Sequence, residues 1–372
     1  MDFEQFKEVV KDSIKDYLPE SYENATVELK DVIKNNDTHL TGLTVREEGT
    51  SIAPTIYLED YFKAYEAGDK NMDEIMTRIA DLYDEASRDG LSLNAEELVS
   101  NITDYEATKE KIIPRVVNKE NNEERLKGMP HTDMGDLAVT YHVDLGDSDN
   151  GQMSVAVSNE MLNKYGVSVS ELHDQACKNM EEMSPAKFET MVETLAHLMI
   201  PGYEDMTPDE KADARAQFEM PDPGMYVLSN DSKAFGAAAI LDTETMDTIR
   251  NEVGDFYILP SSVHEVLIVP KREGMELSDL EAMVKEVNET QVAPNEVLSD
   301  HVYEYDPETK EIFRSDMAAE HQKEKEAAKE KKDVTKERPS LKEKLSEKKK
   351  EVASMKKEAK TPEKTKEMSG RG

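Results

Sequence analysis

The sequence of 372 residues contains one cysteine and no tryptophan, and aromatic residues make up 6% of it. A single cysteine excludes a disulfide framework and a multi-cysteine zinc site within one chain. The longest apolar runs, 237–241 and 266–269, are far shorter than the ~20 residues that span a bilayer. The N-terminal residues lack the basic and apolar regions of a signal peptide. We therefore expect a soluble, cytoplasmic protein that does not associate with membranes.

Common catalytic motifs are also missing. The chain has no G-x-G-x-x-G, Walker loop, H-E-x-x-H or G-x-S-x-G sequence. Asp147–Gly151 begins like an EF-hand loop, but its glycine comes one position early and Ser158 replaces the bidentate glutamate. Ser184–Lys187 matches S-x-x-K without its companion motifs, and Ser184 is better explained as the N-cap of a helix with Pro185 at its first position. The sequence predicts no catalytic residue, no metal ligands and no cofactor, and the motifs weigh against an enzyme.

Acidic residues far outnumber basic ones, and they are unevenly distributed. The formal net charge is −35, from 46 Lys and Arg against 81 Asp and Glu. Residues 318–372 hold 18 basic and 12 acidic residues, which leaves 28 basic and 69 acidic residues in the body, 1–317. Such a charge keeps a protein soluble, and it also suits a basic partner or mimicry of nucleic-acid phosphates. We do not expect the body to bind nucleic acid directly.

Residues 316–372 read as a Lys/Glu-rich, low-complexity tail. Lys and Glu alternate between residues 323 and 332, which favours i,i+4 ion pairs on a solvated helix. An a/d stripe typical of a coiled coil is present, but Lys348 interrupts it. Its members are Leu341, Leu345, Val352 and Met355. Because the tail has few apolar groups to bury, we expect it to be partly helical or disordered.

Apolar periodicity predicts an α+β fold of two mixed helix and antiparallel-sheet modules. The first module, residues 1–117, reads as a helix that ends before Pro19, then three strands and two helices. Its strands are expected at 25–29, 40–45 and 52–58, with turns at Asn35–Asp37 and Glu48-Gly49. Its later helices are expected at 72–90 and after a capping box at Asn94–Glu97. Residues 118–136 are polar and suit a linker.

The second module, residues 137–315, starts with the clearest pattern in the chain. Leu137–Leu145 and Met153–Val157 alternate around Asn150-Gly151, which predicts a β-hairpin over 137–158 with one buried face. A helix capped by Ser168 and Glu171 follows, then a helix from Ser184, and residues 204–224 read as an acidic surface loop. The other expected elements are strands at 225–229, 256–259, 263–269, 302–305 and 311–313, and helices at 246–253 and from Ser278 to Val287.

Three polar side chains on the predicted helices of this module need an interpretation. His173 and Cys177 are four residues apart, a spacing that suits two metal ligands or a thiolate–imidazole pair. Both flank the apolar stripe of their helix, so we interpret Cys177 as a small hydrophobic residue in the packing. His197 lies opposite the apolar stripe of the next helix, and we expect it to face solvent.

Two polar turns beside apolar strands are the best candidates for a ligand-binding site. Turns of this kind can hold polar side chains over a cleft. The alternative is that the hydroxyl and amide groups only satisfy the backbone of their own turns. The candidate residues are Asn230 and Lys233 in one turn and Ser261, Ser262, His264 and Glu265 in the other.

Several of these segments resemble one known family. Phe256–Pro270 with Leu228–Gly236 before it, and also His39–Arg46 and Pro54–Leu58, resemble an uncharacterised domain-of-unknown-function family of gut-dwelling Gram-positive bacteria. The likeness covers about residues 1–315, and it implies an association with conjugative or integrative elements. Arg338–Leu345 is similar to a tail segment on other proteins of such elements. The order of elements is also similar to that of a second uncharacterised family of cytoplasmic bacterial proteins. The resemblance implies no catalytic residue.

These observations lead to three functional expectations. The first is a non-catalytic interaction or accessory protein of a mobile genetic element, which binds a protein partner through its acidic body. The second is a small-molecule-binding or hydrolytic domain that uses the Ser261–Glu265 and Asn230–Lys233 turns. The third is an acidic nucleic-acid mimic that acts on a DNA-binding enzyme.

Overall fold

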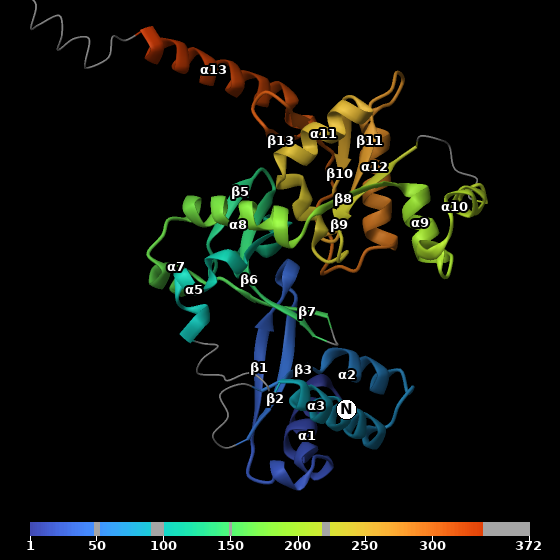
Figure 1. The fold of residues 1–372 in the computed structure, drawn as a ribbon. Coiled ribbons are helices and arrows are strands. Elements are labelled where there is room, and N and C mark those ends of the chain that lie inside the picture. Colours follow the sequence, from blue (N-terminus) through green and yellow to red (C-terminus); the bar gives the residue numbers. More distant parts are fainter. Residues whose placement is uncertain (48–52, 91–99, 149–150, 218–223, 338–372) are drawn as a thin grey trace, which may run out of the picture. The chain divides into compact units, whose positions relative to one another are not determined.

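The computed structural model describes residues 1–47, 53–90, 100–148, 151–217 and 224–337. The chain forms two compact units, Met1–Asp316 and Met317–Gly372. The first unit contains three antiparallel sheets with helices packed on them (Figure 1). The predicted α+β class is confirmed. Within the described residues, no helix combines the length and apolar character that a bilayer crossing requires.

The first unit has eleven described α-helices and thirteen strands. The helices are α1 (Phe3–Ser13), α2 (Glu59–Glu66), α3 (Met72–Gly90), α5 (Tyr105–Thr108), α6 (Glu123–Leu126), α7 (Asn159–Tyr165), α8 (Val169–Met183), α9 (Met191–Met199), α10 (Pro208–Arg215), α11 (Thr243–Val253) and α12 (Leu277–Thr290). The strands are β1 (Thr26–Ile33), β2 (His39–Arg46), β3 (Thr55–Tyr57), β4 (Ile112–Asn118), β5 (His131–Met134), β6 (Leu137–Ser148), β7 (Gly151–Ala156), β8 (Ala186–Thr190), β9 (Tyr226–Asn230), β10 (Phe256–Leu259), β11 (Val266–Pro270), β12 (Tyr303–Asp306) and β13 (Glu311–Arg314).

The N-terminal sheet has the order β1-β2-β3 and a core of its own. The helices α1 and α3 contribute side chains that are completely buried in this core, among them Phe6 and Ile79. The three predicted strands and the first two predicted helices are confirmed, whereas the short helix α2 was not predicted. The Glu48-Gly49 turn and the Asn94–Glu97 capping box lie outside the described residues.

The second sheet has the order β4-β6-β5, with β7 also paired to β6. The predicted hairpin is confirmed as β6 and β7, but both faces of β6 are buried from Leu137 to Val143 rather than one. Residues 118–136, which we expected to form a linker, contain α6 and β5. The strand β5 is an edge strand that pairs with β6. It forms through backbone hydrogen bonds to β6, and its own residues do not alternate between apolar and polar, so the sequence did not reveal it.

The third sheet has six strands in the order β13-β12-β10-β11-β9-β8. Alternate residues of its central strands point to opposite faces. Ile258 and Ile268 pack with α11 and the 3-10 helix η7 (Gly236–Leu241), whereas Leu259 and Val269 pack with α12. The helix α12 begins at Leu277, and its N-cap is Glu276, two residues before Ser278, which was predicted to cap it.

Two predictions in this part of the chain are wrong. Ser184 is the C-cap of α8 rather than the start of a helix, and the residues after it form the edge strand β8. Phe188 stacks on Tyr226 of β9, with 4.8 Å between the ring centroids. This is a contact between two strands, whereas the spacing of the apolar residues after Ser184 had indicated a helix. The predicted loop at 204–224 contains α10, which starts with a capping box between Thr207 and Glu210.

In the second unit, α13 (Ala318–Glu337) confirms that the tail is partly helical. The stripe from Leu341 to Met355 lies outside the described residues.

Asparagine side chains hold a segment of the first unit, residues 294–301, that forms no helix or strand. Asn36 Nδ2 donates to the carbonyls of Pro294 and Val297, both at 2.8 Å. Asn118 Nδ2 donates to Leu298 O at 2.9 Å, and Asn288 Nδ2 donates to Ser299 O at 3.0 Å. Leu298 and Ser299 are buried, and since a buried carbonyl without a partner is costly, the amides of Asn118 and Asn288 allow this part of the segment to lie in the interior.

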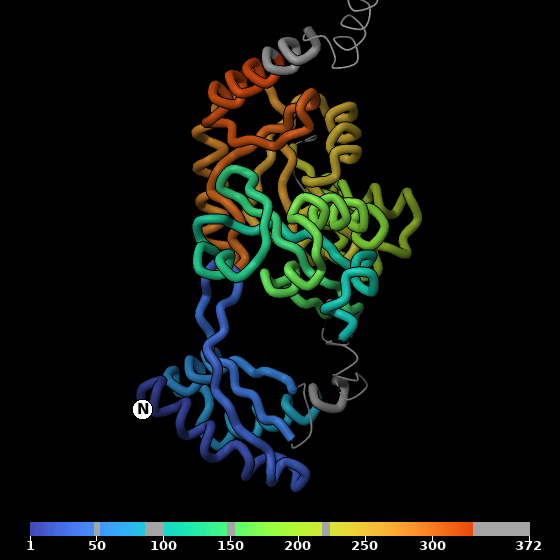
Figure 2. The backbone as a smooth tube through the Cα atoms, turned by 90° about the vertical axis from the view of Figure 1, so that its left-hand side faces the viewer, coloured from blue at the N-terminus to red at the C-terminus, as the bar shows by residue number. Residues whose placement is uncertain are grey.

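The three asparagines come from different parts of the first unit. Asn36 lies in η3 (Asn35–Asp37), at the tip of the β1–β2 hairpin, while Asn118 ends β4 and Asn288 lies in α12. The hairpin tip also reaches the 3-10 turn that follows β4, because Asn36 N donates to Asn122 Oδ1 at 2.9 Å. Figure 2 shows this hairpin running from the N-terminal helices to the other sheets. The segment thus connects all three sheets.

Candidate functional site

The two polar turns predicted as a binding site lie against each other in the structure. One turn follows β9 and carries Asn230 and Lys233, and the other precedes β11 and carries His264. Ser229 Oγ donates to His264 O at 2.8 Å, and Phe235 N donates to His264 Nδ1 at 3.3 Å. The structure therefore brings Asn230, Lys233 and His264 into one region.

Asn230 is the centre of its own turn. It is 4% exposed, and its Nδ2 donates to Ser184 Oγ at 2.7 Å and to Ala234 O at 2.9 Å. Its Oδ1 accepts from Ser232 Oγ at 3.1 Å and from Ala234 N at 3.3 Å. Every donor and acceptor of this amide is used inside the protein, so Asn230 stabilises the turn in which Lys233 has a positive φ of 53°.

The second turn is held in the same manner. Ser262 Oγ accepts from His264 N at 3.1 Å, and Ser261 O accepts from Leu298 N at 3.1 Å. The ring of His264 contacts Phe235 N through Nδ1 and lies 3.4 Å from Glu296 Oε1 through Nε2. Its nitrogens thus face a backbone amide and a carboxylate rather than a serine hydroxyl. Within the described residues, Glu265 makes no hydrogen bond or ion pair.

A small cavity lies beside Asn230. Arg115, Ser184, Asn230 and Phe235 contribute to its lining, and its volume of about 10 Å³ is close to that of one water site. The Arg115 guanidinium carbon lies 3.5 Å from the centre of the Phe235 ring, and its Nη2 donates to Ser154 Oγ at 2.8 Å. In this conformation the cavity has room for a water molecule rather than for a substrate.

Burial dominates the electrostatics around Arg115. Arg115 is 8% exposed, and burial lowers its pKa to about 10, with a further contribution from Arg125. His142, on the neighbouring strand β6, is 3% exposed. Burial, and then Arg115 and Arg125, hold the pKa of His142 well below its ordinary value. His142 is therefore a neutral imidazole, 3.2 Å from Thr140 Oγ1 through its Nε2.

The His173–Cys177 pair forms as the spacing predicted, but it is not an activated thiol. Cys177 Sγ lies 3.6 Å from His173 Nε2, and His173 Nδ1 lies 3.2 Å from Tyr141 Oη. Burial, with a smaller contribution from the charge of Asp174, raises the pKa of Cys177 to about 11. A protonated thiol is a poor nucleophile, which agrees with a packing role.

The expectation that His197 faces solvent is wrong. Its side chain is 8% exposed, and Nδ1 lies 2.7 Å from Glu204 Oε1. Nε2 lies 3.6 Å from Glu189 Oε1 and 3.7 Å from Glu193 Oε1. Glu189 belongs to β8, the strand that we had interpreted as the first turns of a helix, so the error has the same origin.

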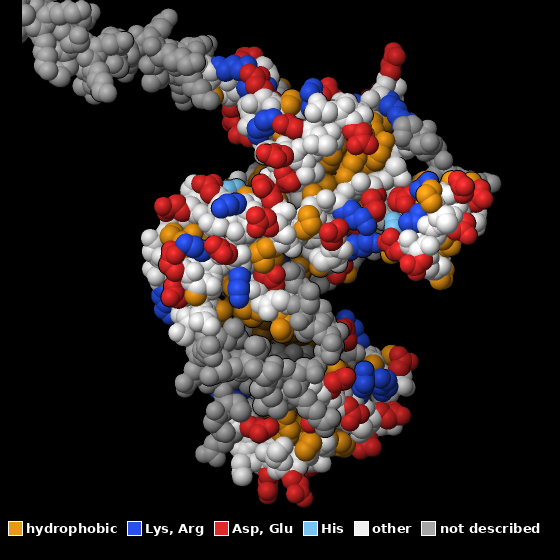
Figure 3. Space-filling view, viewed as in Figure 1, with side chains coloured by type: hydrophobic (Ala, Val, Ile, Leu, Met, Phe, Trp, Pro, Cys, Tyr) orange, Lys and Arg blue, Asp and Glu red, His pale blue; other side chains and the backbone are white. Residues whose placement is uncertain are grey.

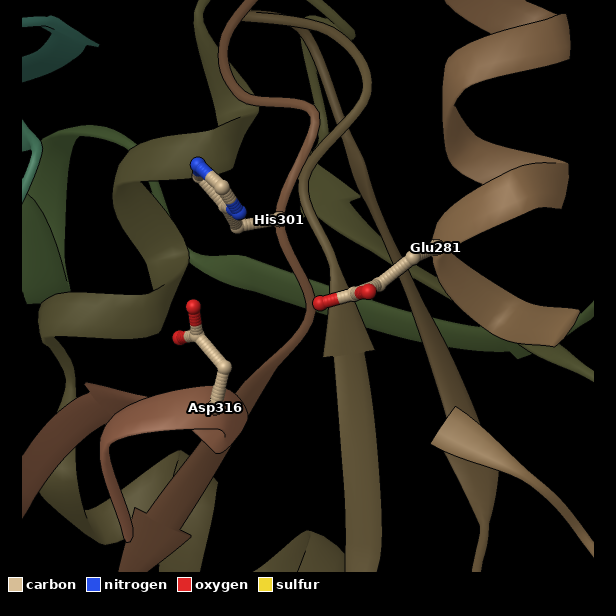
Figure 4. A group of neighbouring side chains, drawn as sticks. All are labelled: Glu281, His301 and Asp316. Atoms are coloured by element: carbon tan, nitrogen blue, oxygen red, sulfur yellow. The ribbon is translucent and has the colours of Figure 1, made fainter. Parts of the chain in front are cut away.

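Sequence reasoning missed a group of side chains that could hold a metal ion. Glu281, His301 and Asp316 each place one ligand atom within 4.8 Å of the other two. Figure 4 shows them gathered from α12, from the segment before β12 and from the 3-10 turn after β13. They are 20 and 15 residues apart in the sequence, with no motif spacing, so no sequence signal could have found them.

Residues 3–307 match a family described as Family of unknown function (DUF5688). The chain belongs to this family. No curated protein and no solved structure matches the chain. The part that matches DUF5688 includes all six predicted binding residues, and it includes Glu281 and His301 but ends before Asp316. Since the family is one of unknown function, membership assigns no role to any of these residues.

A glycine substitution tests the packing of the two turns. A Cβ atom on Gly236 would lie 2.2 Å from Ser229 Oγ and 2.6 Å from His264 O. We expect Gly236→Ala to lower the free energy of unfolding by about 1–3 kcal/mol in urea denaturation. In the control Gly128→Ala the added Cβ would meet Arg125 O at 3.6 Å, an ordinary contact. Equal stability of the two variants would contradict the close approach.

The buried His142 predicts a pH dependence of stability. Its folded-state pKa is lowered, so below about pH 6.5 the unfolded chain binds a proton that the folded chain does not. The stability that the neutral imidazole contributes is present above pH 6.5, and it declines by up to about 1.4 kcal/mol per pH unit as the pH falls. Urea denaturation from pH 7.5 to 5 should therefore show a shallower decline for His142→Gln than for the wild type. Parallel curves would count against a neutral, buried His142.

Proposed function

We propose that this chain is a non-catalytic interaction protein that binds a basic protein partner through its acidic body. Two observations support a binding role over a catalytic one. The predicted turns use their polar groups on one another, and the cavity beside them is about the size of one water molecule. The body also carries 69 acidic and 28 basic residues in positions 1–317, an excess that attracts a partner of opposite charge.

The single observation that carries the proposal is an exposed apolar pair at the end of α9. Leu198 is 68% exposed and Met199 is 66% exposed, whereas Ala196 on the same helix is completely buried. These are the two most exposed large hydrophobic side chains among the described residues. Adjacent exposed apolar side chains with a polar rim are typical of a protein-binding surface.

The lobe formed by α9 and α10 also carries exposed carboxylates. Glu204 and Asp205 are exposed in η6 (Tyr203–Asp205), directly after α9, and Asp209 and Asp213 are exposed on α10. In Figure 3, Asp and Glu side chains cover much of this lobe, with hydrophobic side chains among them.

The basic side chains of the same lobe are engaged within it. Arg215 Nη1 donates to Glu193 Oε2 at 2.5 Å, and Lys211 Nζ lies 5.1 Å from the centre of the Tyr203 ring. The outward charge of the lobe is therefore negative. The chemistry of the α9–α10 lobe suits a partner helix with leucines on one face and lysines or arginines around them.

The setting of this interaction is part of the same proposal. The resemblance of Phe256–Pro270 and its neighbours points to proteins of gut-dwelling Gram-positive bacteria that accompany conjugative or integrative elements. We therefore propose an accessory role in such an element, with a basic protein of the element or of its host as the partner.

A designed peptide tests the α9–α10 lobe directly. The probe is a labelled helical peptide of Lys and Leu, and binding to the full chain is measured by fluorescence anisotropy. We expect Leu198→Ser/Met199→Ser to weaken binding about tenfold or more, because the apolar surface that these two side chains bury against the peptide is lost. Met183→Ser, which changes a 39% exposed residue on α8, should bind as the wild type does.

A second peptide tests whether binding depends on the exposed apolar pair or only on the negative charge of the chain. In this peptide the leucines are replaced by serines, so the charge is the same and the apolar face is absent. We expect it to bind weakly and to lose its binding as salt rises. If both peptides bind equally and the double variant has no effect, charge alone drives the interaction, which would contradict the proposed surface and favour a nucleic-acid mimic.

A further inference from the structure

We propose that Glu281, His301 and Asp316 form a binding site for a divalent transition-metal ion, with Zn²⁺ as the test ion. Their three ligand atoms lie within 4.8 Å of one another, so small side-chain rotations bring them around one ion. Imidazole nitrogen and carboxylate oxygen both bind Zn²⁺ at about 2.0–2.2 Å. Three protein ligands leave the fourth tetrahedral position for water, as in open zinc sites.

Buried hydrogen bonds fix the segments that carry the three ligands. Asn288 lies seven residues after Glu281, about two turns further along the same face of α12. Its Nδ2 donates to Ser299 O at 3.0 Å and to Asp300 Oδ1 at 2.7 Å, directly before His301. Ser315 N donates to Val302 O at 2.8 Å, which ties the residue before Asp316 to the residue after His301. The ligands are therefore held near one another without a metal.

Two buried oxygen atoms on the segments that carry the ligands lack a hydrogen-bond partner. Asn288 is 7% exposed and Ser315 is 8% exposed, and among the described residues neither Asn288 Oδ1 nor Ser315 Oγ has a partner. Both residues belong to the hydrogen bonds that hold the ligands.

Arg314 reduces the negative charge of the site but leaves the Asp316 carboxylate able to bind an ion. Its Nε donates to Asp316 Oδ1 at 3.0 Å, and its Nη2 donates to Asp316 Oδ2 at 2.6 Å. This interaction orients the carboxylate as outer residues orient metal ligands, and each oxygen keeps a second lone pair. Glu281, Asp316 and Arg314 together still carry one negative charge, which favours a cation.

Calorimetry with the full chain tests the site. After treatment with EDTA and its removal, the protein is titrated with ZnCl₂. We expect one ion per chain at this site, and at least a tenfold loss of affinity in His301→Ala and in Glu281→Gln. His39→Ala is the matched control, because it removes a histidine that is 58% exposed and pairs with Glu124. That variant should bind Zn²⁺ as the wild type does.

Cobalt gives a second readout that reports the ligands themselves. Co²⁺ bound to the wild type should show visible absorption of a low-coordinate site, and His301→Ala should lose it while its far-ultraviolet circular dichroism stays unchanged. Glu281→Gln, a nearly isosteric change, keeps the test valid if His301→Ala fails to fold. Equal binding of Zn²⁺ by all variants, or no binding by the wild type, would overturn the site. Neither result bears on peptide binding by the α9–α10 lobe.

Discussion

The carbonyl groups of Pro294, Val297, Leu298 and Ser299 belong to a segment that forms no helix or strand, and asparagine side chains donate hydrogen bonds to them. A side-chain amide is well suited to this task, because it carries two donors on one nitrogen and no charge to desolvate. Ser299 extends the connection, since its Oγ donates to Asp136 Oδ2 at 2.9 Å in the turn between β5 and β6. Tyr303 also donates to Asp136. One irregular segment thus joins the N-terminal hairpin, the second sheet, the six-stranded sheet and α12.

The two proposed binding sites differ in how firmly the rest of the first unit fixes them. The asparagine-bound segment leads directly into His301, so the proposed metal ligands stand on backbone that several elements fix. The α9–α10 lobe is different. Its own core is small, with Ala196, Tyr203 and Ala214 as its buried apolar residues, and it leaves Leu198 and Met199 to solvent. A binding surface on a lobe of this kind changes without cost to the sheets, which suits recognition of a partner.

The sequence predicted a helix or strand correctly where its apolar residues follow a single regular spacing. The alternation of β6 and β7, the apolar period of α1, the capping box of α8 and the apolar runs of β10 and β11 all predicted the observed elements. It failed for β5 and β8, because edge strands depend on a neighbouring backbone rather than on their own period. Because β8 was missed, His197 was wrongly expected to face solvent. The group of Glu281, His301 and Asp316 depends on tertiary contacts between distant segments, which no local pattern records. Asn230 and His264 were correctly singled out as neighbours of a turn, but the roles of their polar groups required coordinates.

The most direct test of this account is hydrogen exchange of the full chain in the wild type and in Asn118→Ala. Removing the amide leaves Leu298 O without its donor, at a cost of about 1–3 kcal/mol for a buried acceptor. If the asparagine-bound segment depends on that bond, backbone amides from Val297 to Val302 should exchange faster in the variant, while those of α1 keep their wild-type protection. Unchanged exchange from Val297 to Val302 would contradict the claim that asparagine side chains hold this segment in place.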